Sequence, residues 1–106
     1  MDLAAVNEPT GHDSGVRHGA ALLAFVDAVM GSDDAALARA RAALRSVLSD
    51  EAFVDTCAVV GAFNVVDRIA DATGIPLDAG MAAMSIDARK ELDLARFASS
   101  ANTPGA

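Results

Sequence analysis

Residues 57–78 read CAVVGAFNVVDRIADATGIPLD, and this stretch indicates most about the fold. Between positions 57 and 66 nearly every residue is apolar or small, whereas a surface helix normally has a single apolar stripe. The letters TGIP are then typical of a helix end, because Gly74 suits the left-handed position after the last turn and Pro76 prevents continuation. We therefore expect a long helix over residues 50–73 that is buried on nearly all sides.

The rest of the chain has the composition of an all-α protein. Alanine, the strongest helix former, is abundant, and 53% of the 106 residues are hydrophobic. Val, Ile and Thr occur singly or in pairs within helical patterns and not in alternating runs, which argues against strands. We expect a small bundle of about four helices, over residues 16–30, 33–48, 50–73 and 86–98. The connection over residues 77–84 is expected to hold a single helical turn.

Gly, Pro and polar residues prevail at both ends of the chain. The expected organisation is a flexible arm (1–15), one helical domain (16–98) and a flexible tail (99–106). Within the domain, Gly31 is expected to end the first helix in the left-handed conformation. Ser32 and Ser49 are expected to cap the second and third helices. Because the first joint is only two residues long, the first two helices must be antiparallel or steeply crossed.

The third helix has more apolar side chains than the other three helices can cover, because each of those helices has only a narrow apolar stripe. Fully burying a Val, Ile or Phe side chain contributes about 1.5–3 kcal/mol, so a further packing partner adds stability. We expect a second copy of the chain to be that partner, which makes the protein a homo-oligomer. The alternative is that the third helix forms the centre of a monomeric bundle.

Charge and composition exclude several classes of protein. The formal net charge is −7, and no cluster of Lys and Arg is large enough for a phosphate backbone, so we expect no nucleic-acid partner. No 18-residue uncharged apolar run is present, which predicts no membrane span. The first 15 residues lack the pattern of a signal peptide, so we expect a cytoplasmic protein. A single cysteine excludes an internal disulfide and a CxxC motif.

Two segments carry a resemblance to a known family. The helix opened by LSDEAFVD (48–55) continues into AFNVVDRIADATGIPLD (62–78), with a Phe-Asn-x-x-Asp-Arg-x-Ala pattern and then Gly-x-Pro-Leu. This resembles the C-terminal half of the alkylhydroperoxidase D / carboxymuconolactone decarboxylase superfamily, over roughly residues 18–78. Asp67 stands where Asn is common in that family. The resemblance implies an all-helical fold that assembles as trimers or hexamers.

The part of the family's sequence that carries its reactive residues has no counterpart in the matched region. The peroxidase branch uses a CxxC pair with a nearby His and Glu, upstream of the matched region, and Cys57 is at no matching position. The resemblance therefore implies a non-redox member without cofactor, with a small-molecule-binding or accessory scaffolding role. The alternative is an acid–base enzyme of the carboxymuconolactone decarboxylase type that acts on a small carboxylate or lactone. Its candidate catalytic residues are His18, Asp67 and Arg68.

The polar end of the third helix admits two interpretations. Asn64, Arg68 and Asp71 are spaced four and three residues apart, so they share one face, with Asp67 beside them. In the first interpretation Arg68 binds a small anion or carboxylate and an aspartate accepts a proton. In the second, the same residues form a buried charged network that fixes how helices pack. The acidic neighbours already neutralise the arginine, which favours the network.

The two histidines and the cysteine are weaker candidates. His12 and His18 have a spacing that could supply metal ligands, but they lie between a glycine-rich arm and a helix start, so we expect no metal site. Cys57 lies in the most apolar helix, where a cysteine behaves as a small buried hydrophobe.

Overall fold

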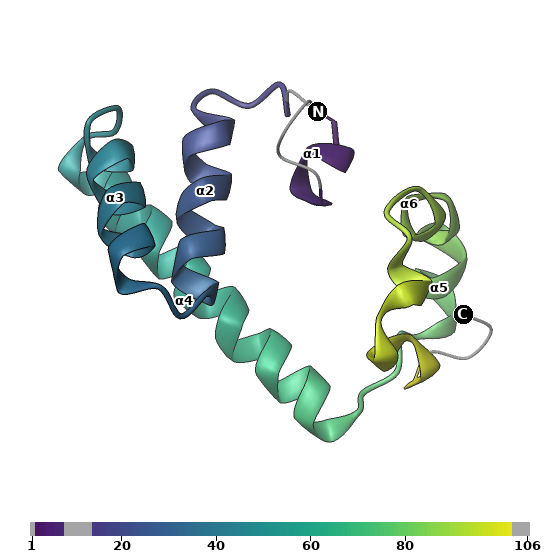
Figure 1. The fold of residues 1–106 in the computed structure, drawn as a ribbon. Helices are drawn as coiled ribbons and strands as arrows, with labels where there is room; N and C mark the ends of the chain where they lie inside the picture. Colours follow the sequence, from purple (N-terminus) through teal and green to yellow (C-terminus); the bar gives the residue numbers. More distant parts are fainter. Residues whose placement is uncertain (1, 8–13, 103–106) are drawn as a thin grey trace. The chain divides into compact units, whose positions relative to one another are not determined.

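The structure is a computed structural model that describes residues 2–7 and 14–102, and this part of the chain is helical without any strand (Figure 1). The all-α prediction is confirmed. The described α-helices are α1 (Ala4–Asn7), α2 (Gly19–Met30), α3 (Asp34–Arg45), α4 (Asp50–Thr73), α5 (Ala79–Met84) and α6 (Ile86–Glu91). Two 3₁₀ turns follow, Leu94–Arg96 and Ala98–Asn102.

The chain divides into two compact units, Met1–Ala62 and Phe63–Ala106. Helix α4 begins in the first unit and ends in the second. Short helical segments occur inside both stretches that the sequence predicts to be loose, since α1 lies in the arm and the second 3₁₀ turn reaches into the tail. No helix in the described part of the chain is both long enough and apolar enough to span a bilayer.

Helices α2 and α3 form the expected pair, but their ends differ from the prediction in detail. His18 has φ 59°, a left-handed conformation that cannot continue a helix, so α2 begins at Gly19 and not at residue 16. Gly31 is extended and not left-handed, with its N–H donating to the Asp27 carbonyl at 3.0 Å. The cap of α3 is Asp33 and not Ser32, because the Asp33 carboxylate accepts from the N–H groups of Ala35 and Ala36.

The core of the first unit depends on few large side chains. Phe25 and Leu44 are its large buried residues, with 3% and 0% of their surface exposed. The ring of Phe53, from the first turn of α4, lies 5.6 Å from the ring of Phe25, and the guanidinium of Arg45 lies 5.8 Å from the Phe53 centroid. Phe53 thus joins α4 to both helices of the pair.

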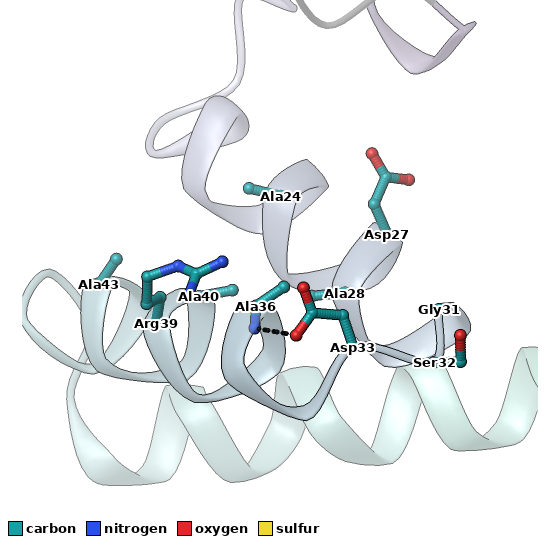
Figure 2. A pocket seen from close by; sticks show the side chains of 10 residues that line it. All are labelled: Ala24, Asp27, Ala28, Gly31, Ser32, Asp33, Ala36, Arg39, Ala40 and Ala43. Atoms are coloured by element: carbon teal, nitrogen blue, oxygen red, sulfur yellow. Dashed lines mark hydrogen bonds between the residues drawn. The ribbon is translucent and has the colours of Figure 1, made fainter.

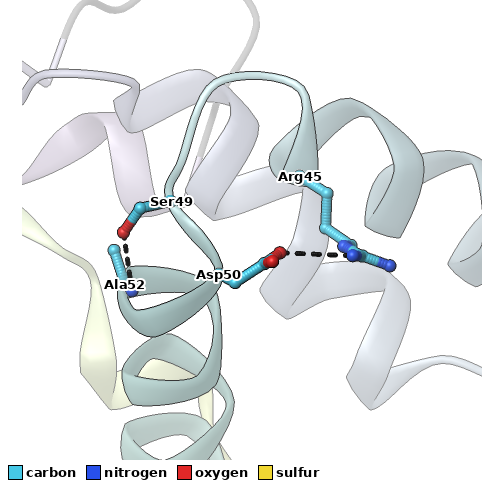
Figure 3. A network of polar contacts seen from close by, with 4 residues as sticks. All are labelled: Arg45, Ser49, Asp50 and Ala52. Carbon is cyan, nitrogen blue, oxygen red and sulfur yellow. Dashed lines mark hydrogen bonds and ion pairs between the residues drawn. The ribbon is translucent and has the colours of Figure 1, made fainter.

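Local hydrogen bonds fix where α4 begins (Figure 3). The Ser49 hydroxyl accepts from the Ala52 N–H at 3.2 Å, in agreement with the predicted cap. Arg45 donates to the Asp50 carboxylate at 3.2 Å, although both side chains are exposed. Hydrogen bonds from its own backbone N–H and from Ser49 hold the pKa of Glu51 below the usual range of a carboxyl group. Acid in the first turn is also favourable to the helix dipole.

The end of α4 is as the sequence predicts. The helix stops at Thr73, and Gly74 has φ 67°, the left-handed conformation that a glycine adopts without strain. The N–H groups of Gly74 and Ile75 both donate to the Ala70 carbonyl, which satisfies a carbonyl of the last turn.

The C-terminal helices differ more from the expectation. The connection after Pro76 contains the six-residue α5, capped by Asp78, whose carboxylate accepts from the Met81 N–H at 2.9 Å. The expected helix over residues 86–98 stops at Glu91, because Asp93 takes a left-handed φ of 49°. Short 3₁₀ turns replace the rest of it. Arg89 of α6 donates through Nη2 to the Ala82 carbonyl of α5 at 2.8 Å, which ties the two short helices together.

We expect Leu44→Ala to lower the free energy of unfolding by about 2–5 kcal/mol, because the side chain is fully buried in a small core. Urea denaturation followed by circular dichroism measures the change. The matched control is Val47→Ala, three residues on, whose side chain is 42% exposed and should cost less than about 1 kcal/mol. Equal losses in the two variants would contradict this view of the core.

Candidate functional site

Helix α4 remains open to solvent along most of its length. None of its residues is buried, and its large apolar side chains from Val54 to Ile69 include six that are 55% to 64% exposed. These six are Val54, Val59, Phe63, Val65, Val66 and Ile69. In the described part of the chain, the helix that the sequence predicts to be buried therefore has no buried residue.

One exposed face of α4 is continuous. Val54, Cys57, Gly61, Val65 and Arg68 are spaced three or four residues apart and are all exposed, and we call this row the α4 stripe. The half-buried residues of the same helix, among them Phe53, Thr56 and Val60, lie on another face. At the centre of the stripe, a Cβ built on Gly61 meets no atom within 4 Å.

The polar residues at the end of α4 do not form a buried network within the chain. Asp67, Arg68 and Asp71 are all exposed, and Asn64 is half-buried. In the described part of the chain, Arg68 makes no ion pair. The expected burial of Arg68 is thus not provided by its own chain, and its burial against another copy stays a prediction.

The candidate acid–base residues come from different parts of the molecule. His18 is half-buried before α2, in the first unit, and its Nε2 accepts a hydrogen bond from Arg17 Nε at 3.2 Å. Asp67 and Arg68 belong to the second unit. Each unit by itself therefore holds an incomplete acid–base set. His12 lies outside the described residues.

Cys57 is an exposed free thiol, which differs from the buried cysteine that the sequence favours. A reactive thiol needs cationic neighbours that stabilise the thiolate. The residues one turn away on the α4 stripe are Val54 and Gly61, which supply none. Among the residues that the structure describes, no group of three His, Cys, Asp or Glu side chains is placed to hold a metal ion.

Two hollows mark the surface of the separate units. The first, of about 610 Å³, lies between α2 and α3 and is walled mainly by alanines, with Asp27 and Arg39 at its edges (Figure 2). The Asp33 carboxylate, which also lines this hollow, already accepts hydrogen bonds from the first turn of α3. The methyl groups of the alanines and this engaged carboxylate offer few polar groups that would orient a ligand.

The second hollow, of about 720 Å³, lies within the second unit. The end of α4, the connection over residues 75–77, α6 and the 3₁₀ turns surround it. Of the predicted site residues, Asp71 lines this hollow. Arg89 also lines it, and sequence reasoning missed this residue because turns, and not a helical spacing, bring α6 and the end of α4 to the same hollow.

Comparison of the chain with protein-family models, with curated proteins and with solved structures gives no match.

Arg68→Ala is expected to change the free energy of unfolding by less than about 0.5 kcal/mol in dilute protein, because the side chain is exposed in the single chain. Urea denaturation at low and high protein concentration gives the measurement, and any larger loss should appear only at the high concentration. A loss of about 3–5 kcal/mol in dilute protein would instead put Arg68 in a buried charged network within the chain.

We expect no peroxidase turnover from Cys57, because the chain has no second cysteine to resolve an oxidised intermediate. The assay uses an organic hydroperoxide with a dithiol reductant, and the Cys57→Ser variant is the control. Turnover by the wild type that clearly exceeds that of Cys57→Ser would contradict this expectation.

Proposed function

We propose that the chain is a non-redox protein of the alkylhydroperoxidase D-like type that assembles with copies of itself and serves as a small-molecule-binding or scaffolding oligomer. The observation that carries the proposal is the exposed α4 stripe, with the apolar side chains beside it. The order of elements supports the family assignment, since a pair of helices, α2 and α3, precedes the long α4.

Gly61 indicates how a second copy would dock. A glycine inside a helix costs roughly 0.5–1 kcal/mol relative to alanine, and none of the described residues requires one here, since a Cβ would meet no atom of them within 4 Å. Such a glycine is compatible with the close approach of another backbone. Gly61 lies near the middle of α4, so two copies of the helix would cross at their centres.

An antiparallel crossing best fits the charges of the stripe. Arg68 is the one basic residue of α4, while Asp50 and Glu51 occupy its first turn. A crossing centred on Gly61 brings Arg68 opposite Val54 of the second copy, within one helical turn of that copy's Asp50. A parallel crossing would oppose the two Arg68 side chains. The antiparallel contact is two-fold symmetric, which is compatible with a dimer or a hexamer but not with a simple trimer.

The apolar side chains supply a modest driving force. Full burial of a Val or Ile side chain contributes about 1.5–3 kcal/mol, and Val54, Val65 and Ile69 are a little over half exposed in the single chain. Burying the exposed part of each of these side chains would therefore contribute about 1 kcal/mol. Both copies of the chain would make the same contribution. The sum of about 6 kcal/mol is comparable to the lower end of the roughly 4–15 kcal/mol that association costs, so these side chains alone support a weak assembly that depends on protein concentration.

Gly61→Leu is expected to convert the assembly to monomers while the isolated chain keeps its helix content, because leucine blocks the crossing, whereas a Cβ at this position meets no atom of the described residues within 4 Å. Sedimentation velocity over a series of increasing protein concentrations measures the mass, and the thermal midpoint of the wild type should rise with concentration. The matched control is Ala38→Leu at an exposed position of α3, which should leave the mass unchanged.

Two results would contradict this proposal. One is a wild-type protein that is monomeric, with a thermal midpoint independent of concentration. The other is a Gly61→Leu variant that keeps the wild-type mass. No observation within either unit favours the acid–base alternative, since neither unit by itself holds all of His18, Asp67 and Arg68.

A further inference from the structure

The hollow of the second unit has the size and lining of a small-molecule site. Its volume of about 720 Å³ falls within the roughly 300–1,000 Å³ of ligand pockets. Its walls include Ile75, Ile86 and Phe97, which are 61%, 59% and 47% exposed although they are large and apolar. A molecule with an apolar body would remove all three from water at once.

A cation lies in this apolar lining. Arg89 is half-buried and lines the hollow, and one of its nitrogens, Nη2, donates to the Ala82 carbonyl. Its Nε is shielded from solvent and has no acceptor among the described residues. A charged group whose hydrogen-bonding capacity is only partly used favours an incoming acceptor at the atoms that line the hollow.

Acidic residues nearby do not neutralise Arg89. Asp71 and Asp93 also line the hollow, but both are exposed, and neither forms an ion pair with Arg89 in the described part of the chain. Lys90, an exposed neighbour, adds a second positive charge at the same wall. A planar guanidinium with a second cation beside it suits a carboxylate, which accepts two parallel hydrogen bonds.

We propose that the hollow between the end of α4, α6 and the 3₁₀ turns binds a medium-chain carboxylate, with its carboxylate on Arg89 and its apolar chain against Ile75, Ile86 and Phe97. This site is distinct from the Asn64–Arg68–Asp71 set predicted from the sequence, with which it shares only Asp71. It does not rest on the self-assembly through α4, because every lining residue belongs to one chain.

The chain's isoleucines provide a built-in measurement. There are three, Ile69, Ile75 and Ile86, and the last two line the hollow while Ile69 lies on exposed α4. With isoleucine methyl groups labelled for NMR, we expect sodium decanoate to shift the Ile75 and Ile86 signals and to leave Ile69 in place. The uncharged 1-decanol has the same chain without the carboxylate and should bind at least about tenfold more weakly, as expected for one charged hydrogen-bonded contact.

Two variants locate the carboxylate and the apolar chain. Arg89→Gln should weaken decanoate binding about tenfold or more and leave decanol binding within about twofold. Arg41→Gln in α3 makes the same change of charge at an exposed position outside the hollow and should have no effect. Because Arg89→Gln also loses the bond to Ala82, Ala95→Leu is a second variant, which fills the hollow from a 3₁₀ turn and removes no side-chain hydrogen bond.

Each outcome of these experiments either supports or overturns the proposed site. Loss of decanoate binding in Ala95→Leu, with the wild-type circular dichroism spectrum, supports the site. Equal affinity for decanoate and decanol would overturn the assigned chemistry. Shifts at Ile69 in place of Ile75 and Ile86 would move the binding to α4 and overturn the location. Failure of this proposal leaves the sedimentation result for Gly61→Leu unaffected, so the two proposals fail independently.

Discussion

The packing of the first unit depends on the contacts that the Phe53 ring makes. An alanine-rich chain has few side chains large enough to lock helices together, and here one aromatic ring at the start of α4 meets both Phe25 of α2 and Arg45 of α3. Alanine gives the helices their propensity but little apolar area, so the free energy of packing is concentrated at these few positions. The apolar side chains that this small core does not bury remain exposed on α4. The small size of the core therefore determines both the stability of the unit and the apolar character of its surface.

Sequence reasoning worked where local chemistry decides the backbone. The TGIP signal placed the end of α4 correctly, because the glycine and proline act on neighbouring torsions alone. It was wrong where two capping groups compete: Ser32 and Asp33 are both good N-caps, and only the path of the chain selects the aspartate. The apolar pattern after Ile86 could not reveal that Asp93 turns left-handed, since aspartate is merely permissive of that conformation.

The candidate sites differ in how far the sequence could find them. The polar end of α4 was visible because its residues share a helix face at fixed spacing, yet spacing alone does not tell whether a face is covered. Asp67, Arg68 and Asp71 are exposed in the single chain, and Asn64 is half-buried. The Arg89 hollow was not visible, because residues 71, 89 and 97 come together through turns that no periodicity encodes. A lone arginine in a short helix has no sequence signature of its own.

The left-handed residue Asp93 has a consequence for how such a chain could change. A continuous helix over residues 86–98 would need Asp93 to move from the left-handed into the right-handed region and Phe97 to leave its extended conformation. Leu94 and Phe97 would then rotate with the helix and leave the wall of the hollow. The backbone conformation at Asp93 and Phe97 thus separates a chain with this open hollow from a chain with one more regular helix. A substitution at either position acts on that choice.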